Sequence, residues 1–207
     1  MKHYTKWFVA AAGVAGGLVF GNAARGQGIL STFPAGFTLN AYYANWGNTN
    51  ITTINNSSPG FAITSSGYGS GYYALPSAFN GSAYNAIQMT VDVAGPAGPP
   101  ISSAIADLTD ADGTTVQFAM QYGLQAGTGQ TYTELLSAGT TASPGSTPGL
   151  DLAHLTDFNI EDDPGGYSGA YTITYRQLSL VIVPEPASPA LFALGGAGLL
   201  VAYRRRK

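Results

Sequence analysis

Apolar and polar residues alternate along much of the chain between residues 27 and 183. The pattern is clearest in AIQMTVDV (86–93) and TVQFAMQYGL (115–124), where every second side chain is apolar. This period of two is typical of a strand with one buried face, because successive side chains point to opposite sides of an extended backbone. The side chains predicted to face a core are Ile87, Met89, Val91, Val93, Val116, Phe118, Met120 and Tyr122.

Further stretches also predict strands, and no part of this region carries a convincing helical stripe. They are FTLNAYYA (37–44), FAIT (61–64), YTELLS (132–137) and LTDFNIE (155–161), while TDADGTT (109–115) has the composition of a turn. Residues 65–84 are rich in Gly, Ser and Tyr and predict a loop or an irregular sheet edge. Roughly eight to ten short antiparallel strands separated by turns indicate an all-β protein built as a β-sandwich.

The last predicted strand, AYTITYRQLSLVIV (170–183), changes the parity of its apolar positions. One parity holds Tyr171, Ile173 and Tyr175, and the other holds Leu178, Leu180 and Ile182. The change predicts a β-bulge or bend at Arg176 or Gln177 that keeps both sets facing a core. A long, bent last strand of this kind is similar to that of jelly-roll domains of the carbohydrate-binding type.

The N-terminal 26 residues have the layout of a secretory signal peptide. Lys2 and Lys6 precede an apolar run at 7–20, and small and polar residues follow it. This run is shorter than the roughly 20 apolar residues that a spanning helix needs. Cleavage is predicted before Gln27, and a pair of small residues at 21 and 23 offers an earlier alternative.

The C-terminal residues have the layout of a membrane-spanning segment with a basic tail. Residues 187–203 carry no charge and would extend roughly 25 Å as a helix, near the lower limit for crossing a bilayer. The tail consists of Arg204, Arg205, Arg206 and Lys207. By the positive-inside rule this tail is expected on the cytoplasmic side, which leaves the middle of the chain outside.

A triplet, Pro184, Glu185 and Pro186, stands directly before the apolar run. Triplet, apolar run and basic terminus together resemble the PEP-CTERM sorting signal of Gram-negative bacteria. The resemblance implies recognition by an exosortase, a membrane-embedded enzyme that cleaves near the triplet, and an association with extracellular polysaccharide. A plain C-terminal anchor is the alternative. The predicted organisation is a signal peptide (1–26), an exported β-sandwich domain (27–183) and a sorting signal (184–207).

Charge is segregated along the chain in a way that excludes one class of partner. Arg176 is the only Lys or Arg between residues 27 and 183, where ten acidic side chains lie, so this region carries a net charge of −9. Such a domain repels nucleic acid, whose binding depends on neutralising phosphates. No cofactor is expected except a structural Ca²⁺ bound by clustered carboxylates. Asp110 and Asp112 begin like a calcium loop, but an ordinary turn is the favoured interpretation.

The region lacks the residue patterns of an active site. The chain has no cysteine, and His154 is the only histidine of the predicted domain, where a structural role is favoured. Asp162 and Asp163 are adjacent and have no defined separation of the kind that glycoside hydrolysis requires. The sequence therefore predicts a protein that is not an enzyme.

Aromatic side chains gather in the first half of the predicted domain. Within YYANWGNTN (42–50), Trp46 with Tyr42 and Tyr43 is the best candidate for contact with a sugar face. Two functions remain open. The first is an exported, exosortase-sorted surface or matrix protein with a structural role, and the second is a carbohydrate-binding module for extracellular polysaccharide. Either protein would pass through the secretion machinery and the inner membrane before reaching the cell surface or the medium.

Overall fold

The computed structural model describes residues 27–34, 40–41, 51–55, 61–65, 69–98, 100–163 and 169–184. The described residues form twelve strands and two short 3₁₀ helices. The strands are β1 (Gly28–Ser31), β2 (Asn40–Ala41), β3 (Ile51–Asn55), β4 (Phe61–Ser65), β5 (Gly69–Phe79), β6 (Ala86–Ala94), β7 (Ser103–Asp110), β8 (Thr115–Tyr122), β9 (Gly127–Leu135), β10 (Thr140–Ser143), β11 (Leu155–Asp162) and β12 (Tyr171–Val181). The helices are η1 (Leu136–Ala138) and η2 (Leu152–His154). The all-β class predicted from the sequence is confirmed.

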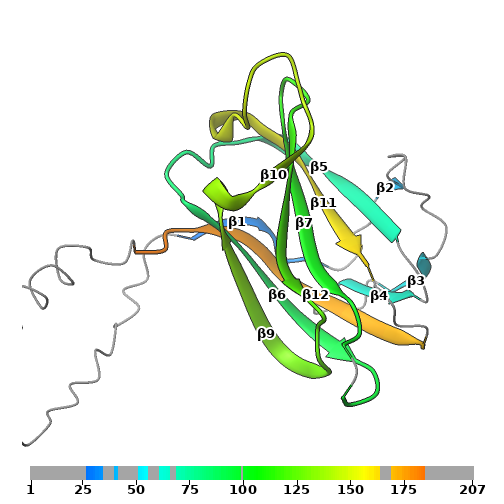
Figure 1. The fold of residues 1–207 in the computed structure, drawn as a ribbon. Helices are drawn as coiled ribbons and strands as arrows, with labels where there is room; N and C mark the ends of the chain where they lie inside the picture. The colour runs from blue at the N-terminus through cyan, green and yellow to red at the C-terminus, as the bar shows by residue number, and fades with distance from the viewer. Residues whose placement is uncertain are drawn as a thin grey trace, which may run out of the picture.

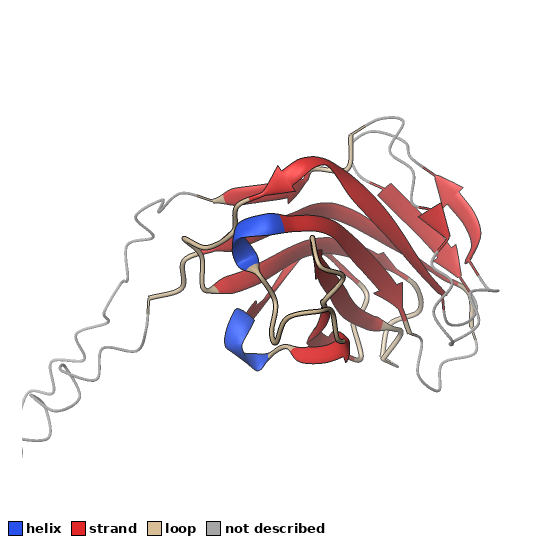
Figure 2. Cartoon of the chain, turned by 90° about the horizontal axis from the view of Figure 1, so that it is seen from above, coloured by secondary structure: helices blue, strands red, loops and turns tan. Residues whose placement is uncertain are grey.

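The strands form two six-stranded antiparallel sheets packed as a sandwich (Figures 1 and 2). Sheet A has the order β3-β4-β12-β6-β9, with β1 also paired to β12. Sheet B has the order β10-β8-β7-β11-β5-β2. Neighbouring strands within each sheet are mostly distant in sequence, as in a jelly roll, and the long last strand β12 pairs with β1, β4 and β6 from the first half of the chain.

The core lies between the inner faces of the two sheets and follows the period-two pattern of the sequence. Ile87, Met89 and Val91 of β6 are fully buried, and Phe118 of β8 packs into the same cluster. Burying an aliphatic or aromatic side chain of this size contributes about 1.5–3 kcal/mol, which is why the alternation fixes the face that each strand turns inward. The predicted inward faces of β6 and of the first part of β8 are confirmed.

The parity change in the last strand has the predicted cause. The register between β12 and β6 shifts between Tyr175 and Gln177, so Arg176 is the extra residue of a β-bulge. Tyr175 before the bulge and Leu178 after it are both buried. One edge of β12 pairs with β4 before the bulge and with β1 after it. The bulge therefore lets β12 pair with β4 and β1 along the same edge while both apolar sets face the core.

The prediction that Tyr122 faces the core is wrong, because a second bulge interrupts β8. Ala104 of β7 lies opposite Gln121, and Ile105 lies opposite Ala119, so Met120 is the extra residue. Beyond this point the parity of β8 is reversed, and the Tyr122 side chain is 63% exposed. The bulge thus places a large aromatic ring on the outer face of sheet B.

Of the two alternatives for residues 65–84, the loop is wrong, whereas an irregular sheet edge fits in part, because only the two-residue β2 pairs with the outer side of β5 and the register with β11 shifts between Ala74 and Phe79. Residues 69–79 form the long strand β5, which pairs with β11 along most of its length. Tyr73 of β5 packs against Phe158 with ring centroids 5.4 Å apart. The Gly- and Ser-rich composition lowers the intrinsic strand preference, but pairing and aromatic packing across two strands outweigh it.

Both ends of the described domain lie at one end of sheet A. Gly28, at the start of β1, lies opposite Leu180, near the end of β12 (Figure 1). No helix among the described residues is long and apolar enough to cross a membrane. The predicted signal peptide (1–26) and apolar run (187–203) lie outside the described residues, so both remain predictions.

Candidate functional site

A row of polar side chains crosses the outer face of sheet B, opposite the core. Gln117 of β8 lies opposite Asp107 of β7, Asp107 lies opposite Asn159 of β11, and Asn159 lies opposite Tyr72 of β5. Directly paired residues share a face of a sheet, so these four side chains point the same way. We call them, together with Glu161, the polar row. Their β-strand neighbours Leu108 and Phe158 alternate with them and point into the core.

The central members of the polar row bind one another. The Asn159 Nδ2 group donates to Asp107 Oδ2 at 3.2 Å, and the Gln117 Nε2 group donates to Glu161 Oε2 at 2.9 Å. Asp107, Asn159 and Glu161 are only 2%, 1% and 7% exposed, whereas Gln117 and Tyr72 are half-buried. The row therefore has a rigid, hydrogen-bonded floor with more accessible side chains at its two ends.

The electrostatics of the floor are unusual because two carboxyl groups are buried together. Burial, and then the negative charge of Glu161, raise the pKa of Asp107 to about 8. At neutral pH the Asp107 carboxyl therefore keeps its proton. The Oδ1 atom of Asp107 is buried and accepts no hydrogen bond within the described residues.

The basic side chain of this region lies in the other sheet. Arg176, the only Lys or Arg between residues 27 and 183, lies in sheet A, where its Nε donates to Asp92 Oδ2 at 2.8 Å. The outer face of sheet B is therefore a neutral-to-acidic surface. It can exchange hydrogen bonds with neutral hydroxyl groups, whereas an anionic ligand would be repelled.

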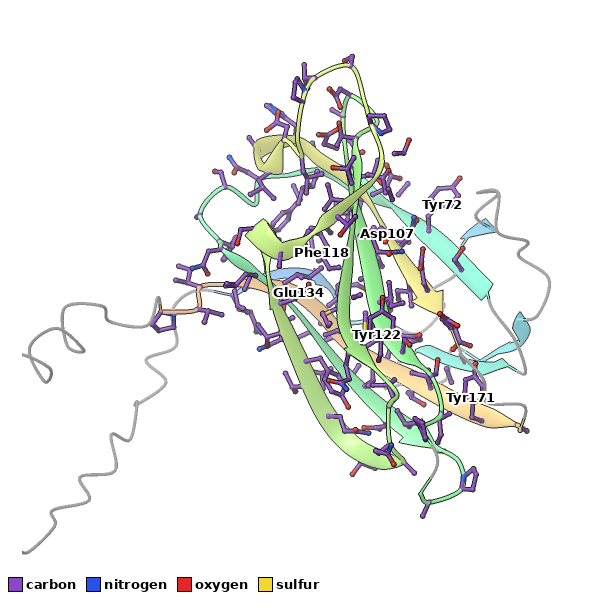
Figure 3. All side chains as sticks on the ribbon, viewed as in Figure 1. Tyr72, Asp107, Phe118, Tyr122, Glu134 and Tyr171 are labelled. Atoms are coloured by element: carbon purple, nitrogen blue, oxygen red, sulfur yellow. The ribbon has the colours of Figure 1, made fainter. Side chains whose placement is uncertain are left out.

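Tyr122 completes this face on the side of β8. Its cross-strand partner is Ser103 of β7. Ser103 and Asp107 lie on the same face of β7, four residues apart, which corresponds to about 13 Å at roughly 3.3 Å per residue. In Figure 3, Asp107 and Tyr122 follow one another along the β7–β8 pair, and Tyr72 lies farther across the sheet. Sugar-binding sites combine an exposed aromatic ring with hydrogen-bonding side chains on the same face, because the face of a sugar ring is apolar and its edge carries hydroxyl groups.

Most of the site residues predicted from the sequence lie outside the described part of the structure. Tyr42, Tyr43 and Trp46 lie outside the described residues, so their predicted contact with glycan stays a prediction. Of the sorting motif, Pro184 is described and exposed, while Glu185, Pro186 and the basic tail at 204–207 lie outside.

The loop of Asp110 and Asp112 forms a turn whose carboxylates accept backbone hydrogen bonds. Asp110 Oδ1 accepts from the Thr114 amide at 3.0 Å, and Asp112 Oδ2 accepts from the Thr147 amide at 2.7 Å. The first bond closes the β7–β8 turn, the second joins that turn to the loop after β10, and both fit the favoured interpretation as a turn. No group of three or more acidic or histidine side chains within the described residues has the arrangement of a metal site. The structural Ca²⁺ remains a hypothesis.

The other candidate acids and the histidine are held in separate places. Asp162 is fully buried between the sheets and accepts hydrogen bonds from Ser102 and Tyr171, whereas Asp163 is half-buried at the end of β11. The His154 side chain is 62% exposed and pairs with Asp151 at 2.7 Å, a local contact across the turn of η2. Sequence analysis missed the polar row, although alternate polar positions in LTDFNIE did carry its signal.

The fold of the domain is similar to that of several solved carbohydrate-binding modules. The solution structure of CtCBM11 superposes with a TM-score of 0.53 at 16% identity, over 79% of this chain and 99% of that one. A family 11 carbohydrate-binding module from Clostridium thermocellum, in complex with a β-1,3-1,4-mixed-linked tetrasaccharide, gives 0.50 at 18% identity, over 77% and 97%. An exo-β-agarase gives 0.51 at 13% identity, and the chain spans 26% of its length. At these identities the likeness establishes the jelly-roll-like fold.

The end of the chain carries the PEP-CTERM protein-sorting motif, which matches residues 183–207. The resemblance noted in the sequence is thereby confirmed for the end of the chain. No curated protein matches the chain by sequence.

Proposed function

We propose that the protein is an exported, exosortase-sorted surface protein whose β-sandwich binds neutral polysaccharide on the outer face of sheet B. The exposed Tyr122 ring stacks on a sugar face, and Gln117 and Tyr72 exchange hydrogen bonds with hydroxyl groups. The buried floor of Asp107, Asn159 and Glu161 holds Gln117 in place. The single observation that carries the proposal is the exposed Tyr122 on the same outer face as a preorganised polar row, on a fold similar to that of carbohydrate-binding modules.

The role proposed is binding, without catalysis. Glu161 is held by Gln117, and its carboxyl neighbour Asp107 is 2% exposed, so neither is free to reach a glycosidic bond. The acidic character of the face favours neutral over anionic polymers, because the only arginine of the domain is engaged elsewhere.

Affinity electrophoresis with a panel of polysaccharides tests the proposal. The panel contains β-1,3-1,4-glucan, agarose, the polysaccharide of the native cell and an anionic polymer of matched length. We expect retention by one or more neutral polymers and none by the anionic one. Tyr122→Ala should weaken retention about fivefold to tenfold, since one stacked aromatic contributes on the order of 1 kcal/mol. Tyr122→Phe, which keeps the ring, should retain most of the affinity.

The matched control is Leu135→Ala, which removes an apolar side chain of similar exposure, 48%, from sheet A. It should leave retention unchanged. Equal binding by wild type and Tyr122→Ala would contradict the proposed face. A structural matrix role is the second candidate, favoured by the burial of the floor residues, and it would stand if the wild-type protein bound no polysaccharide at all.

A further inference from the structure

The Pro-Glu-Pro triplet follows directly on Val183, whose backbone is held by the side chain of Asn85. Asn85 precedes β6, and its backbone amide donates to the Val181 carbonyl at 3.2 Å. Its side-chain Nδ2 donates to the Val183 carbonyl at 2.8 Å, and its Oδ1 accepts from the Val183 amide at 2.8 Å. The Asn85 side chain therefore bonds both backbone groups of Val183, as a neighbouring strand would.

These bonds extend the sheet two residues past the end of the regular strand β12. Asn85 is itself fixed from the other side, because its carbonyl accepts from the Leu136 amide at 2.9 Å. The next residue, Pro184, has no amide hydrogen and cannot continue the ladder. Pro184 is exposed, and it is the first residue of the Pro-Glu-Pro triplet. The paired sheet thus ends where the triplet begins, with no spacer between them.

The start of the domain reinforces the same end of sheet A. Gly28 of β1 lies opposite Leu180, and the Gln27 Nε2 group donates to Ser179 Oγ at 3.1 Å. The last strand is therefore paired on both edges until shortly before the motif (Figure 1). A cut within these residues requires local unfolding of the sheet, since a peptidase needs an extended, unpaired segment.

We propose that Asn85 is a positioning residue for sorting, which locks Val183 into the sheet and so sets the upstream limit at which the chain can be cut. The proposal rests on the sorting role given above. The partner at this end of the domain is the membrane-embedded processing enzyme, which meets the exposed Pro184 directly after the locked Val183. The folded domain, and not the enzyme alone, defines where the mature protein ends.

The test uses the full chain expressed in a host that contains the processing enzyme, with mass spectrometry of the C-terminus of the surface-released protein. Wild type should give a single C-terminus at Pro184 or beyond. Asn85→Ala should give additional ends within residues 181–183, together with amide exchange at Val183 about fivefold faster or more in the intact chain. Asn85→Asp, which keeps the acceptor for the Val183 amide, should show a smaller effect on both.

Asn80→Ala is the matched control, because Asn80 lies in the same turn but its side chain bonds only to Ser82 within the described residues. It should leave the C-terminus and the exchange at Val183 as in wild type. A Gly-Ser-Gly-Ser spacer inserted between Val183 and Pro184 should give several C-termini within the spacer, because the inserted residues are unpaired. The proposal would be overturned if wild type, the Asn85 variants and the spacer variant all had the same single C-terminus. A wild-type C-terminus upstream of Val183 would also overturn it. Wild type that is never shortened would instead overturn the sorting role.

Discussion

Asp107 allows the clearest physical test of the polar row. Asp107→Asn replaces the protonated carboxyl by an amide of the same shape, which can still accept from Asn159 and donate toward Glu161. The pKa of Asp107 rises from its ordinary 3.8 to about 8 because burial and then the charge of Glu161 disfavour ionisation. One pKa unit corresponds to about 1.36 kcal/mol, so ionisation of the unfolded chain reduces folding stability at pH 7 by up to about 4 kcal/mol.

The sign of the pH dependence follows from the raised pKa. The stabilising contribution of protonated Asp107 is complete below about pH 3.8, is lost progressively as the pH rises to about 8, and changes no further above that. The variant has no such titration. We therefore expect Asp107→Asn to be more stable than wild type at pH 7–8, by on the order of 2–4 kcal/mol, with a flatter slope between pH 5 and 8.

Urea denaturation of residues 27–184 at intervals between pH 5 and 9 measures both quantities. Asp157→Asn is the matched control, because it removes a half-buried carboxylate from the same face of β11. It should not reproduce the stabilisation expected of Asp107→Asn at pH 7–8, because Asp157 is only half-buried. Wild-type stability that is constant from pH 5 to 8, with Asp107→Asn destabilised throughout, would show that Asp107 is ionised in the folded protein and would refute the reasoning.

Further predictions concern residues outside the polar row. Tyr175→Phe removes a buried hydroxyl that has no hydrogen-bond partner within the described residues, and calorimetry should show stabilisation by about 1 kcal/mol. Asp92→Ala leaves Arg176 without its partner and should cost about 1 kcal/mol in urea denaturation, an effect that high salt reduces. Hydrogen bonds, first from Thr147, hold the pKa of Asp112 below its ordinary value, so wild type should lose stability as the pH falls below about 4, and Asp112→Asn should lose less in the same thermal melts. If carboxylates bind a structural Ca²⁺, millimolar calcium should raise the melting temperature more than sodium chloride of equal ionic strength, and equal shifts would mean screening alone.

Much of the fold follows from local sequence patterns, because the period-two alternation in β6, β8 and β11 states which face is buried. The bulge at Arg176 was predictable for the same reason, since the apolar positions change parity there in the sequence. The bulge at Met120 gives no parity change in the sequence, because both Met120 and Tyr122 are apolar enough to continue the alternation. Strand β5 was missed because its pairing with β11 joins residues far apart in sequence, which composition does not report.

The polar row and the Asn85 contacts share this nonlocal origin. Alternate polar residues in β7 and β11 were visible in the sequence, but the order β8-β7-β11-β5 that sets them side by side is a property of the folded sheet. Asn85 lies 98 residues from Val183, and an asparagine in a turn gives no local indication that it will bond a distant strand. A site assembled from several strands is thus harder to predict than the strands themselves.

The two proposed sites lie on different sheets, and this separation has a consequence for how the protein works. The start of β1 and the end of β12 belong to sheet A, whereas Tyr122 and the polar row occupy the outer face of sheet B. Attachment through the C-terminal segment therefore need not cover the face proposed to bind polysaccharide. We expect the unprocessed, membrane-held chain and the released protein to retain the same polysaccharide with the same affinity, as measured by binding to membrane vesicles and to soluble protein. Binding that appears only after release would place the polysaccharide site at the same end of the domain as the sorting motif, contrary to the geometry of the two sheets.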